Sequence, residues 1–175
     1  MALHFCRASP FSLSLHPDKT RLIEFGRFAA RNGEKRGRSK PETFKFLGFV
    51  LICDKCRRGN FRIRRKSRRD RMRATLREVK KALRRRFNRP TPETGKWLAS
   101  VVSGYFAYHA VPTNIAALAA FREHVIALWH RQLSRRSQRA HVDWTRIAKL
   151  ADEFLPKPRI LHPWPSVRFA AKHPR

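Results

Sequence analysis

The chain has 175 residues, 42% of them hydrophobic, and a formal net charge of +29 from 41 Lys and Arg against 12 Asp and Glu. The hydrophobic content suffices for a buried core and argues against wholesale disorder. A charge this large opposes compaction unless a polyanion neutralises it, so nucleic acid is the expected partner. No apolar segment is long enough to span a bilayer, and a membrane is not expected as a partner.

Three cysteines, at positions 6, 53 and 56, are too few for a disulfide framework. The first residues also lack the basic and apolar regions of a signal peptide. Both observations favour a reducing compartment inside the cell, and we expect a cytoplasmic protein.

The N-terminal part predicts a β-hairpin. Residues 11–15 alternate between apolar side chains and serine, which is typical of a half-buried strand. Pro17 and Asp18 suit a turn, and residues 20–25 predict a second strand. The polar, glycine-containing segment 27–41 is interpreted as a loop.

The strongest strand prediction is residues 44–52, which read FKFLGFVLI. Gly48 inside it suggests a bulge or a close approach of another backbone. Residues 60–64 alternate as a returning strand, so a small antiparallel sheet is expected before the most basic part of the chain.

The segment from Arg57 to Arg89 holds 17 Lys or Arg in 33 residues, against only two acids. Such a run is usually a solvated tail. Here, however, apolar residues recur at helical spacing, and Ser67 followed by Asp70 resembles an N-cap with a carboxylate in the first turn. We therefore predict an amphipathic helix with a buried stripe and a basic outer surface. The stripe is Met72, Leu76, Val79, Leu83 and Phe87.

Two further long helices are predicted beyond this segment. Thr91 is placed as an N-cap before Pro92, and Pro112 ends the helix that they open. Thr113 or Asn114 caps the next helix, whose last turn is rich in cations suited to the helix dipole. Its expected buried stripe is Leu118, Phe121, Val125, Leu128, Trp129 and Gln132.

Asp143 is predicted to cap a short helix over residues 144–154. From Pro156 onward four prolines favour an extended tail. The expected fold class is α+β, with a small antiparallel sheet, then three long helices and one short one, then the proline-rich tail.

No catalytic or metal centre is apparent in the sequence. Cys53 and Cys56 have the spacing of half a zinc site, but no second pair follows, and His109, His124 and His130 lack partner spacing. The HPDKT segment offers acid–base groups, although a hairpin turn explains it equally well. The paired carboxylates that hold two metals for phosphoryl transfer are absent. We expect no metal and no cofactor in this chain.

Aromatic residues interleave with the basic ones and could stack on bases. At helical spacing they are more often core, and we interpret them so. They are Trp97, Tyr105, Phe106, Tyr108, Phe121 and Trp129. The end of the last long helix is more telling, because Arg135, Arg136 and Arg139 could bind phosphates bidentately while Gln138 adds a neutral donor.

Several stretches, taken in order, resemble the C-terminal part of bacterial group II intron reverse transcriptase/maturases. They are LSLHPDKTRLIEFGR, FKFLGF, the pair Trp97 and Tyr105, PTN at 112–114, WHRQLSRRSQ, and LPKPRILHPWPSVR. The resemblance covers nearly the whole chain from residue 13, and as an ordered set these motifs are specific.

The resemblance implies four regions. Residues 1–12 match nothing in the family, residues 13–66 correspond to the end of the polymerase palm, residues 67–155 to the thumb or maturase X domain, and residues 156–175 to a C-terminal tail. Within the palm, Lys19 matches a lysine that lies near the incoming nucleotide. Phe46, Leu47, Gly48 and Phe49 match the block that forms the primer grip.

The departures from the family are equally informative. The Tyr-Ala-Asp-Asp box expected just before HPDKT is missing, as are the fingers. We therefore expect no enzyme activity from this chain alone, and Mg²⁺ only in a complete RNA-directed DNA polymerase. The leading hypothesis is an RNA-binding fragment that assists splicing of intron RNA. Alternatives are a split-polymerase subunit completed by a separate chain, and a degenerate remnant of a mobile element.

The residues expected to bind intron RNA are those of the basic segment and of the last long helix's end. They are Arg62, Arg64, Arg65, Lys66, Arg68, Arg69, Arg73, Arg77, Lys80, Lys81, Arg84, Arg85, Arg135, Arg136, Gln138 and Arg139.

Overall fold

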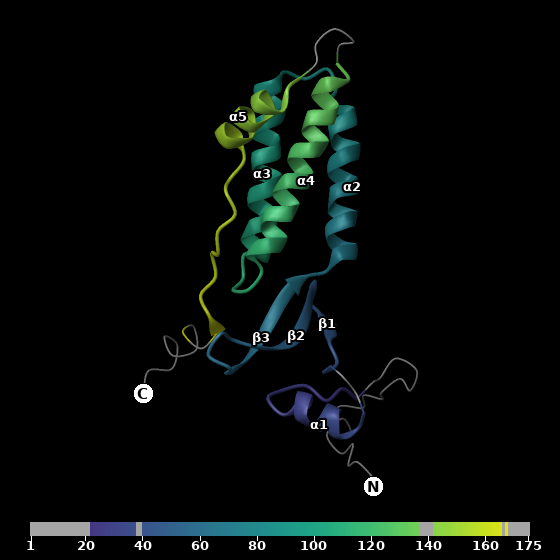
Figure 1. Cartoon of the computed structure of the whole chain (residues 1–175). Helices are drawn as coiled ribbons and strands as arrows, with labels where there is room; N and C mark the ends of the chain where they lie inside the picture. The colour runs from purple at the N-terminus through teal and green to yellow at the C-terminus, as the bar shows by residue number, and fades with distance from the viewer. Residues whose placement is uncertain (1–21, 38–39, 137–141, 166, 168–175) are drawn as a thin grey trace, which may run out of the picture.

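The computed structural model describes residues 22–37, 40–136, 142–165 and 167. It has the predicted α+β architecture, a sheet at one end of a helical bundle (Figure 1). The antiparallel sheet has the order β1-β2-β3, with β1 at Phe44–Phe46, β2 at Phe49–Lys55 and β3 at Phe61–Ser67. The helices are α1 (Ala29–Lys35), α2 (Arg69–Arg85), α3 (Thr91–His109), α4 (Ile115–Ser134) and α5 (Trp144–Phe154).

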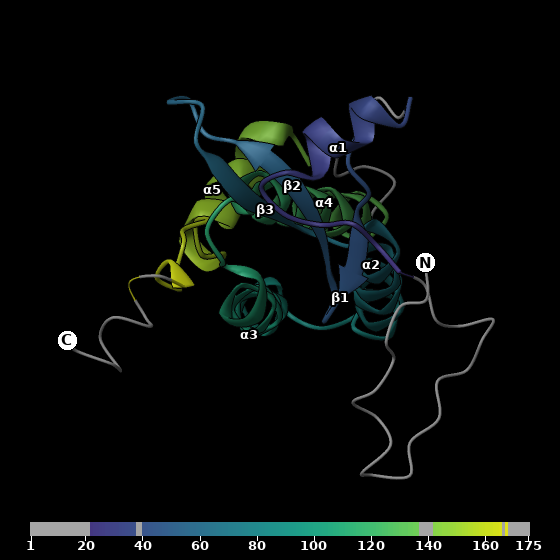
Figure 2. The ribbon, with the colours of Figure 1, turned by 90° about the horizontal axis from the view of Figure 1, so that it is seen from below.

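The helices α2, α3 and α4 lie side by side and bury one continuous core. On α2, Val79 and Leu83 are buried and Met72 and Leu76 pack against them, which confirms four residues of the predicted stripe. The prediction is wrong for the fifth, Phe87, which lies past the helix end and is 37% exposed. From α3 and α4 come the other large core residues, Leu98, Val102, Phe106, Leu118, Phe121, Val125 and Trp129. Seen from below, the sheet lies across the ends of these helices (Figure 2).

The predicted strand over residues 44–52 is in fact a hairpin. Leu47 and Gly48 have φ angles of 43° and 77°, and Phe46 pairs with Phe49 across them. Two positive φ angles define the two-residue turn whose twist matches antiparallel strands. The sequence does not predict this turn, because both of its central residues need a positive φ and only the second of them, Gly48, is a glycine. The first is Leu47, whose apolar side chain makes the segment resemble one continuous strand.

Two further N-terminal predictions are wrong. The expected loop 27–41 contains the helix α1, and Leu22–Phe25 of the expected second strand forms no strand. Glu24 instead accepts hydrogen bonds from Asn32 at 2.5 Å and from Arg36 at 2.9 Å. A tertiary contact therefore stabilises a helix whose composition does not predict it. The rest of the expected hairpin, including residues 11–21, lies outside the described residues.

The predicted cap of α2 is also wrong. Arg68 is the N-cap residue and makes no side-chain cap, while Ser67 ends β3 and is only 3% exposed. Its polar atoms are already used, because its N–H donates to Asn114 Oδ1 at 2.9 Å and its Oγ accepts from Asn114 Nδ2 at 2.8 Å. Similarly, α3 begins at Thr91 itself, with Pro90 as N-cap.

The C-terminal elements agree with the sequence predictions as far as residue 164, whereas residues 165 and 167 of the expected extended tail are helical. Asp143 caps α5 by accepting from the Thr145 N–H at 3.2 Å. Ile147 and Ala151 lie on the face of α5 that packs against the bundle, and both are buried. The tail then runs extended back along α3 toward the sheet (Figure 1), where the N–H groups of Leu161 and His162 donate to the Ala110 carbonyl at 3.0 and 3.1 Å.

Candidate nucleic-acid interface

A groove runs between α2 and α4, and we call it the α2–α4 groove. Two adjoining cavities of about 140 and 320 Å³ form it. It is lined by Arg73, Leu76, Arg77, Lys80, Leu83, Arg84 and Phe87 from the α2 segment, and by His124, Ala127, Leu128, Arg131, Gln132 and Arg135 from the α4 segment. Six of these residues are Arg or Lys and none is Asp or Glu, so the groove presents one sign of charge.

The α2 side of the groove follows from helical spacing. Arg73, Arg77, Lys80 and Arg84 recur at intervals of four, three and four, and they form one face beside the buried stripe. Their aliphatic stems can lie over Leu76 and Leu83 while the charged ends reach solvent. This face therefore combines an apolar floor with a cationic rim.

The other flank of α2 faces α3 and differs in charge. It carries Glu78, Lys81 and Arg85 beside Trp97 and Val101 of α3. Glu78 and Lys81 pair at 2.9 Å. Glu78 therefore lies on the flank that faces α3 and not in the α2–α4 groove.

The α4 side brings residues that the sequence analysis did not assign to binding. Arg131 and His124 line the groove together with Leu128 and the predicted Arg135. These four also recur at intervals of four, three and four along α4. That spacing was visible in the sequence, but only the packing of α4 on α2 shows that this face meets the basic one.

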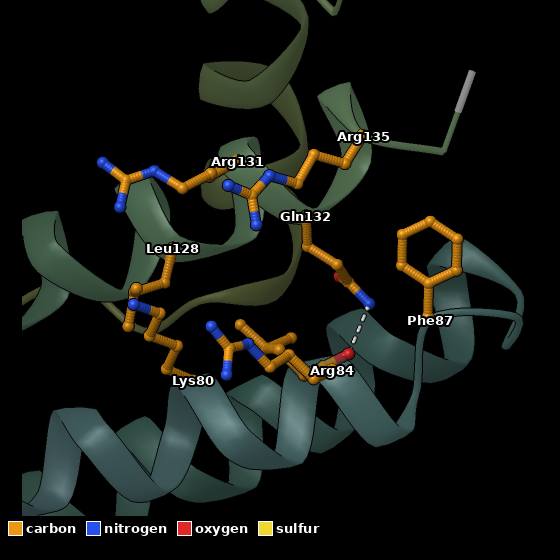
Figure 3. Close-up of a pocket in the computed structure, with 8 residues that line it drawn as sticks. Lys80, Arg84, Phe87, Leu128, Arg131, Gln132 and Arg135 are labelled. Carbon is orange, nitrogen blue, oxygen red and sulfur yellow. Dashed lines mark hydrogen bonds between the residues drawn. The ribbon is translucent and has the colours of Figure 1, made fainter. Parts of the chain in front are cut away.

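Gln132 joins the two walls at the far end of the groove. Its Nε2 donates to the Leu83 carbonyl at 3.0 Å (Figure 3). The same nitrogen donates to the Arg86 carbonyl at 3.3 Å. The Leu83 carbonyl lies in the last turn of α2, where carbonyls lack an intrahelical partner, and Arg86 is the C-cap residue of the same helix. The predicted stripe residue therefore holds α2 and α4 in register.

Several predicted RNA-binding residues lie on β3 or directly after it and pair with acids. Arg62 donates to Asp54 at 2.8 Å, Arg64 lies 3.7 Å from the same carboxylate, and Arg68 pairs with Asp70 at 2.5 Å. The hydrogen bond from Arg62 lowers the pKa of Asp54, and the one from Arg68 lowers the pKa of Asp70 to about 2. These carboxylates stay ionised near neutral pH and offset part of the positive charge of β3 and of the start of α2.

The remaining predicted residues divide between exposed positions and undescribed ones. Lys66 on β3 and Arg69 at the start of α2 are exposed but do not line the groove, and the backbone N–H of Arg65 donates to Thr113 Oγ1 at 2.9 Å. Arg136 follows α4 and does not line the groove either. Lys19, Gln138 and Arg139 lie outside the described residues.

The segment that matches the primer-grip block forms the tip of the β1–β2 hairpin and rests on the end of α3. The Tyr108 hydroxyl donates to the Leu47 carbonyl at 2.8 Å, and the rings of Phe49 and Tyr108 stack at 5.7 Å. Phe46 and Leu47 themselves project to solvent and are 57% and 66% exposed. Gly48 lies against Tyr108 and His109.

The aromatic residues of the helices belong mainly to the core, as interpreted from their spacing. Tyr105, Phe106, Phe121 and Trp129 are buried. Trp97 is half-buried under the Arg86 guanidinium, 4.7 Å from its ring centre, and Tyr108 is exposed at the hairpin contact. Among the described residues that line the α2–α4 groove, Phe87 is present but none of these six rings is.

Within the described part of the chain, no three His, Cys, Asp or Glu side chains gather closely enough to hold a metal ion. Cys53 and Cys56 are free thiols at the end of β2 and just beyond it. None of the described helices is both long and apolar enough to cross a membrane.

Comparison with family models, curated proteins and solved structures finds no match for this chain. The fold and the site together define an α+β chain with a basic groove on its helical bundle.

Proposed function

We propose that this chain binds structured RNA along the α2–α4 groove, as the RNA-binding part of a group II intron reverse transcriptase/maturase. The observation that carries the proposal is the groove's lining of six Arg and Lys with no acid. A row of cations on two parallel helices provides fixed donors for successive phosphates, and Arg can hold each phosphate bidentately.

The family part of the proposal rests on the resemblance in sequence. A small sheet followed by three long helices is the order of elements that the resemblance implies for the end of a palm and a thumb. In this reading the protein assists splicing in the bacterial cytoplasm, has no catalysis of its own, and has intron RNA as its partner. A separate chain carrying the missing polymerase portion would be a second partner and would bring the Mg²⁺ site.

The proposal predicts a steep salt dependence. If the six cations each neutralise one phosphate, the counterions released on binding lower the affinity about 10³-fold between 50 and 200 mM salt. Fluorescence anisotropy with a labelled, folded group II intron RNA measures this slope. An affinity that stays flat over the same range contradicts the proposal.

A matched pair of double variants on α2 tests the location. R77Q/R84Q removes two charges from the groove, and K81Q/R85Q removes two from the flank that faces α3. We expect the groove variant to reduce the salt slope by about two phosphate contacts and the flank variant to leave it nearly unchanged. Equal losses from both variants would mean that net charge, and not the groove, determines binding.

A further inference from the structure

One end of the α2–α4 groove deepens into a pocket of about 140 Å³ (Figure 3). Leu83, Leu128 and Phe87 give it apolar walls, and four cations stand around them, namely Lys80, Arg84, Arg131 and Arg135. A cavity of about 150 Å³ can hold a benzene ring. This pocket therefore has room for one flat heterocycle but not for a base pair.

Gln132 gives the pocket an unused hydrogen-bond acceptor. Its amide nitrogen is fixed toward α2, because it donates to the carbonyls of Leu83 and Arg86, which can only accept. Its Oε1 is buried and has no hydrogen-bond partner among the described residues, although the side chain lines the pocket and is only 7% exposed. Buried acceptors are nearly always satisfied, so this oxygen needs a donor that the described residues do not supply, and an N–H of a ligand in the pocket is one such donor.

We propose that this pocket takes the base of a single unpaired nucleotide of the bound RNA. The base lies between Phe87 and Leu128, an N–H on its edge donates to Gln132 Oε1, and its flanking phosphates lie on Arg84 and Arg135. A helical stem alone would leave both the apolar walls and the acceptor unused, because its bases are stacked inside. The inference rests on the proposed function and specifies its substrate as a stem carrying an unpaired nucleotide.

Two RNA hairpins of equal length and charge isolate the role of the base. One carries a single bulged nucleotide, and the other carries an abasic nucleotide at the same position. Because the phosphates are identical, the salt-dependent part of the affinity is the same for both. We expect the abasic hairpin to bind about tenfold more weakly to the full chain at the same salt concentration, the loss typical of one stacked base.

A variant of the pocket wall ties this difference to the site. Phe87 is partly exposed and follows the end of α2, so F87A is expected to fold, which circular dichroism checks. F87A should bind the bulged and abasic hairpins equally. The control F28A removes an equally large, exposed ring just before α1, away from the groove, and should keep the tenfold difference.

The outcomes separate the inference from the proposed function. Equal affinities of the unaltered protein for both hairpins, with a steep salt dependence, overturn the base pocket and leave the RNA-binding groove in place. A tenfold difference that survives F87A overturns the location of the base. Weak binding of both hairpins that does not vary with salt overturns the proposed function itself.

Discussion

Asn114 joins the sheet to the helical bundle through three hydrogen bonds. Its Oδ1 accepts from the Ser67 N–H at 2.9 Å, and its Nδ2 donates to Ser67 Oγ and to the His109 carbonyl, both at 2.8 Å. The side chain is only 1% exposed, so water cannot replace these partners. Because the last strand and the start of α4 meet here, this residue holds the base of the groove's two walls together.

Replacing this residue by alanine therefore has a clear expected result. N114A leaves the buried Ser67 N–H without its acceptor and removes one donor each from Ser67 Oγ and the His109 carbonyl, and we expect it to lower the free energy of unfolding by about 2–4 kcal/mol. Urea unfolding measures the change. The control N88A alters an exposed asparagine in the turn after α2 and should stay within about 0.5 kcal/mol of the unaltered protein. Similar losses in both variants would contradict the role of the network.

We expect His109 to make the stability of the protein depend on pH. Its ring packs against Tyr105 at 4.1 Å and Phe49 at 5.3 Å between centres, and this burial lowers its pKa below the ordinary 6.5. As the pH falls below about 6.5, the unfolded chain takes up a proton that the folded one resists. The contribution of His109 to the free energy of unfolding should therefore be fully present above pH 7, and the free energy of unfolding should decline as the pH falls toward 5.

Urea titrations at several pH values from 8 to 5 check this prediction. The variant H109Q cannot titrate at this position and should show a smaller decline over the same range. Asp54 and Asp70 do not contribute to this decline. Their pKa values are lowered from 3.8, so the stability that they provide is lost only at a more acidic pH. A variant that declines as steeply as the unaltered protein would contradict the assignment to His109.

The contact between α3 and α5 depends on a glycine. A Cβ at Gly95 would lie 2.7 Å from Cγ of Phe154 and 2.9 Å from both Cδ atoms, too close for the ring to stay in place. The Phe154 ring also packs edge-on against Trp129, at 6.2 Å between centres. The close approach of these two helices therefore requires a residue without a side chain.

Two alanine variants on α3 separate this contact from helix propensity. G95A should lower the free energy of unfolding by about 1–3 kcal/mol, because the core is overpacked. G104A meets nothing within 4 Å, so we expect a gain of about 0.5–1 kcal/mol from the lower backbone entropy of the unfolded helix. Thermal unfolding of both variants checks the signs. A G95A protein as stable as G104A would contradict the tight α3–α5 contact.

The whole molecule carries far more repulsion than attraction among its charges. Its 41 Lys and Arg face 12 Asp and Glu, and the described ion pairs lie largely at the surface, where each stabilises little. Without RNA, the excess of like charge destabilises the compact state. Nucleic acid bound in the groove would remove part of this repulsion.

Added salt should therefore stabilise the protein when it is purified alone. Raising NaCl from 20 to 500 mM shortens the range of the repulsion. A gain on the order of 2 kcal/mol would raise the thermal midpoint by about 4–8 °C for a chain of this size. Differential scanning calorimetry measures the shift, and sucrose serves as the uncharged control. A midpoint that falls with salt would mean that the ion pairs contribute more than the repulsion costs.

Local patterns in the sequence determined the fold class and most element positions. Alternation predicted β3, and helical spacing predicted α2, α3, α4 and α5, because burial of one face imposes a period on each element. The amphipathic nature of α2 and the cap at Asp143 needed no tertiary information. Four residues of the buried stripe of α2 could also be predicted, because apolar residues recur at helical spacing there, whereas Phe87 lies past the helix end.

The tertiary structure decided which cations form the site. Periodicity shows which face of α2 is buried but not which helix borders each flank, so Arg84 and Arg85 could not be told apart by sequence. Arg131 and His124 entered the site only because α4 packs against α2. Ser67 does not cap α2, because it is hydrogen-bonded to Asn114, 47 positions away in the sequence. The turn at Leu47 and Gly48 divides one apolar run into two strands. Each outcome depends on partners distant in sequence, and a local pattern contains no information about those partners.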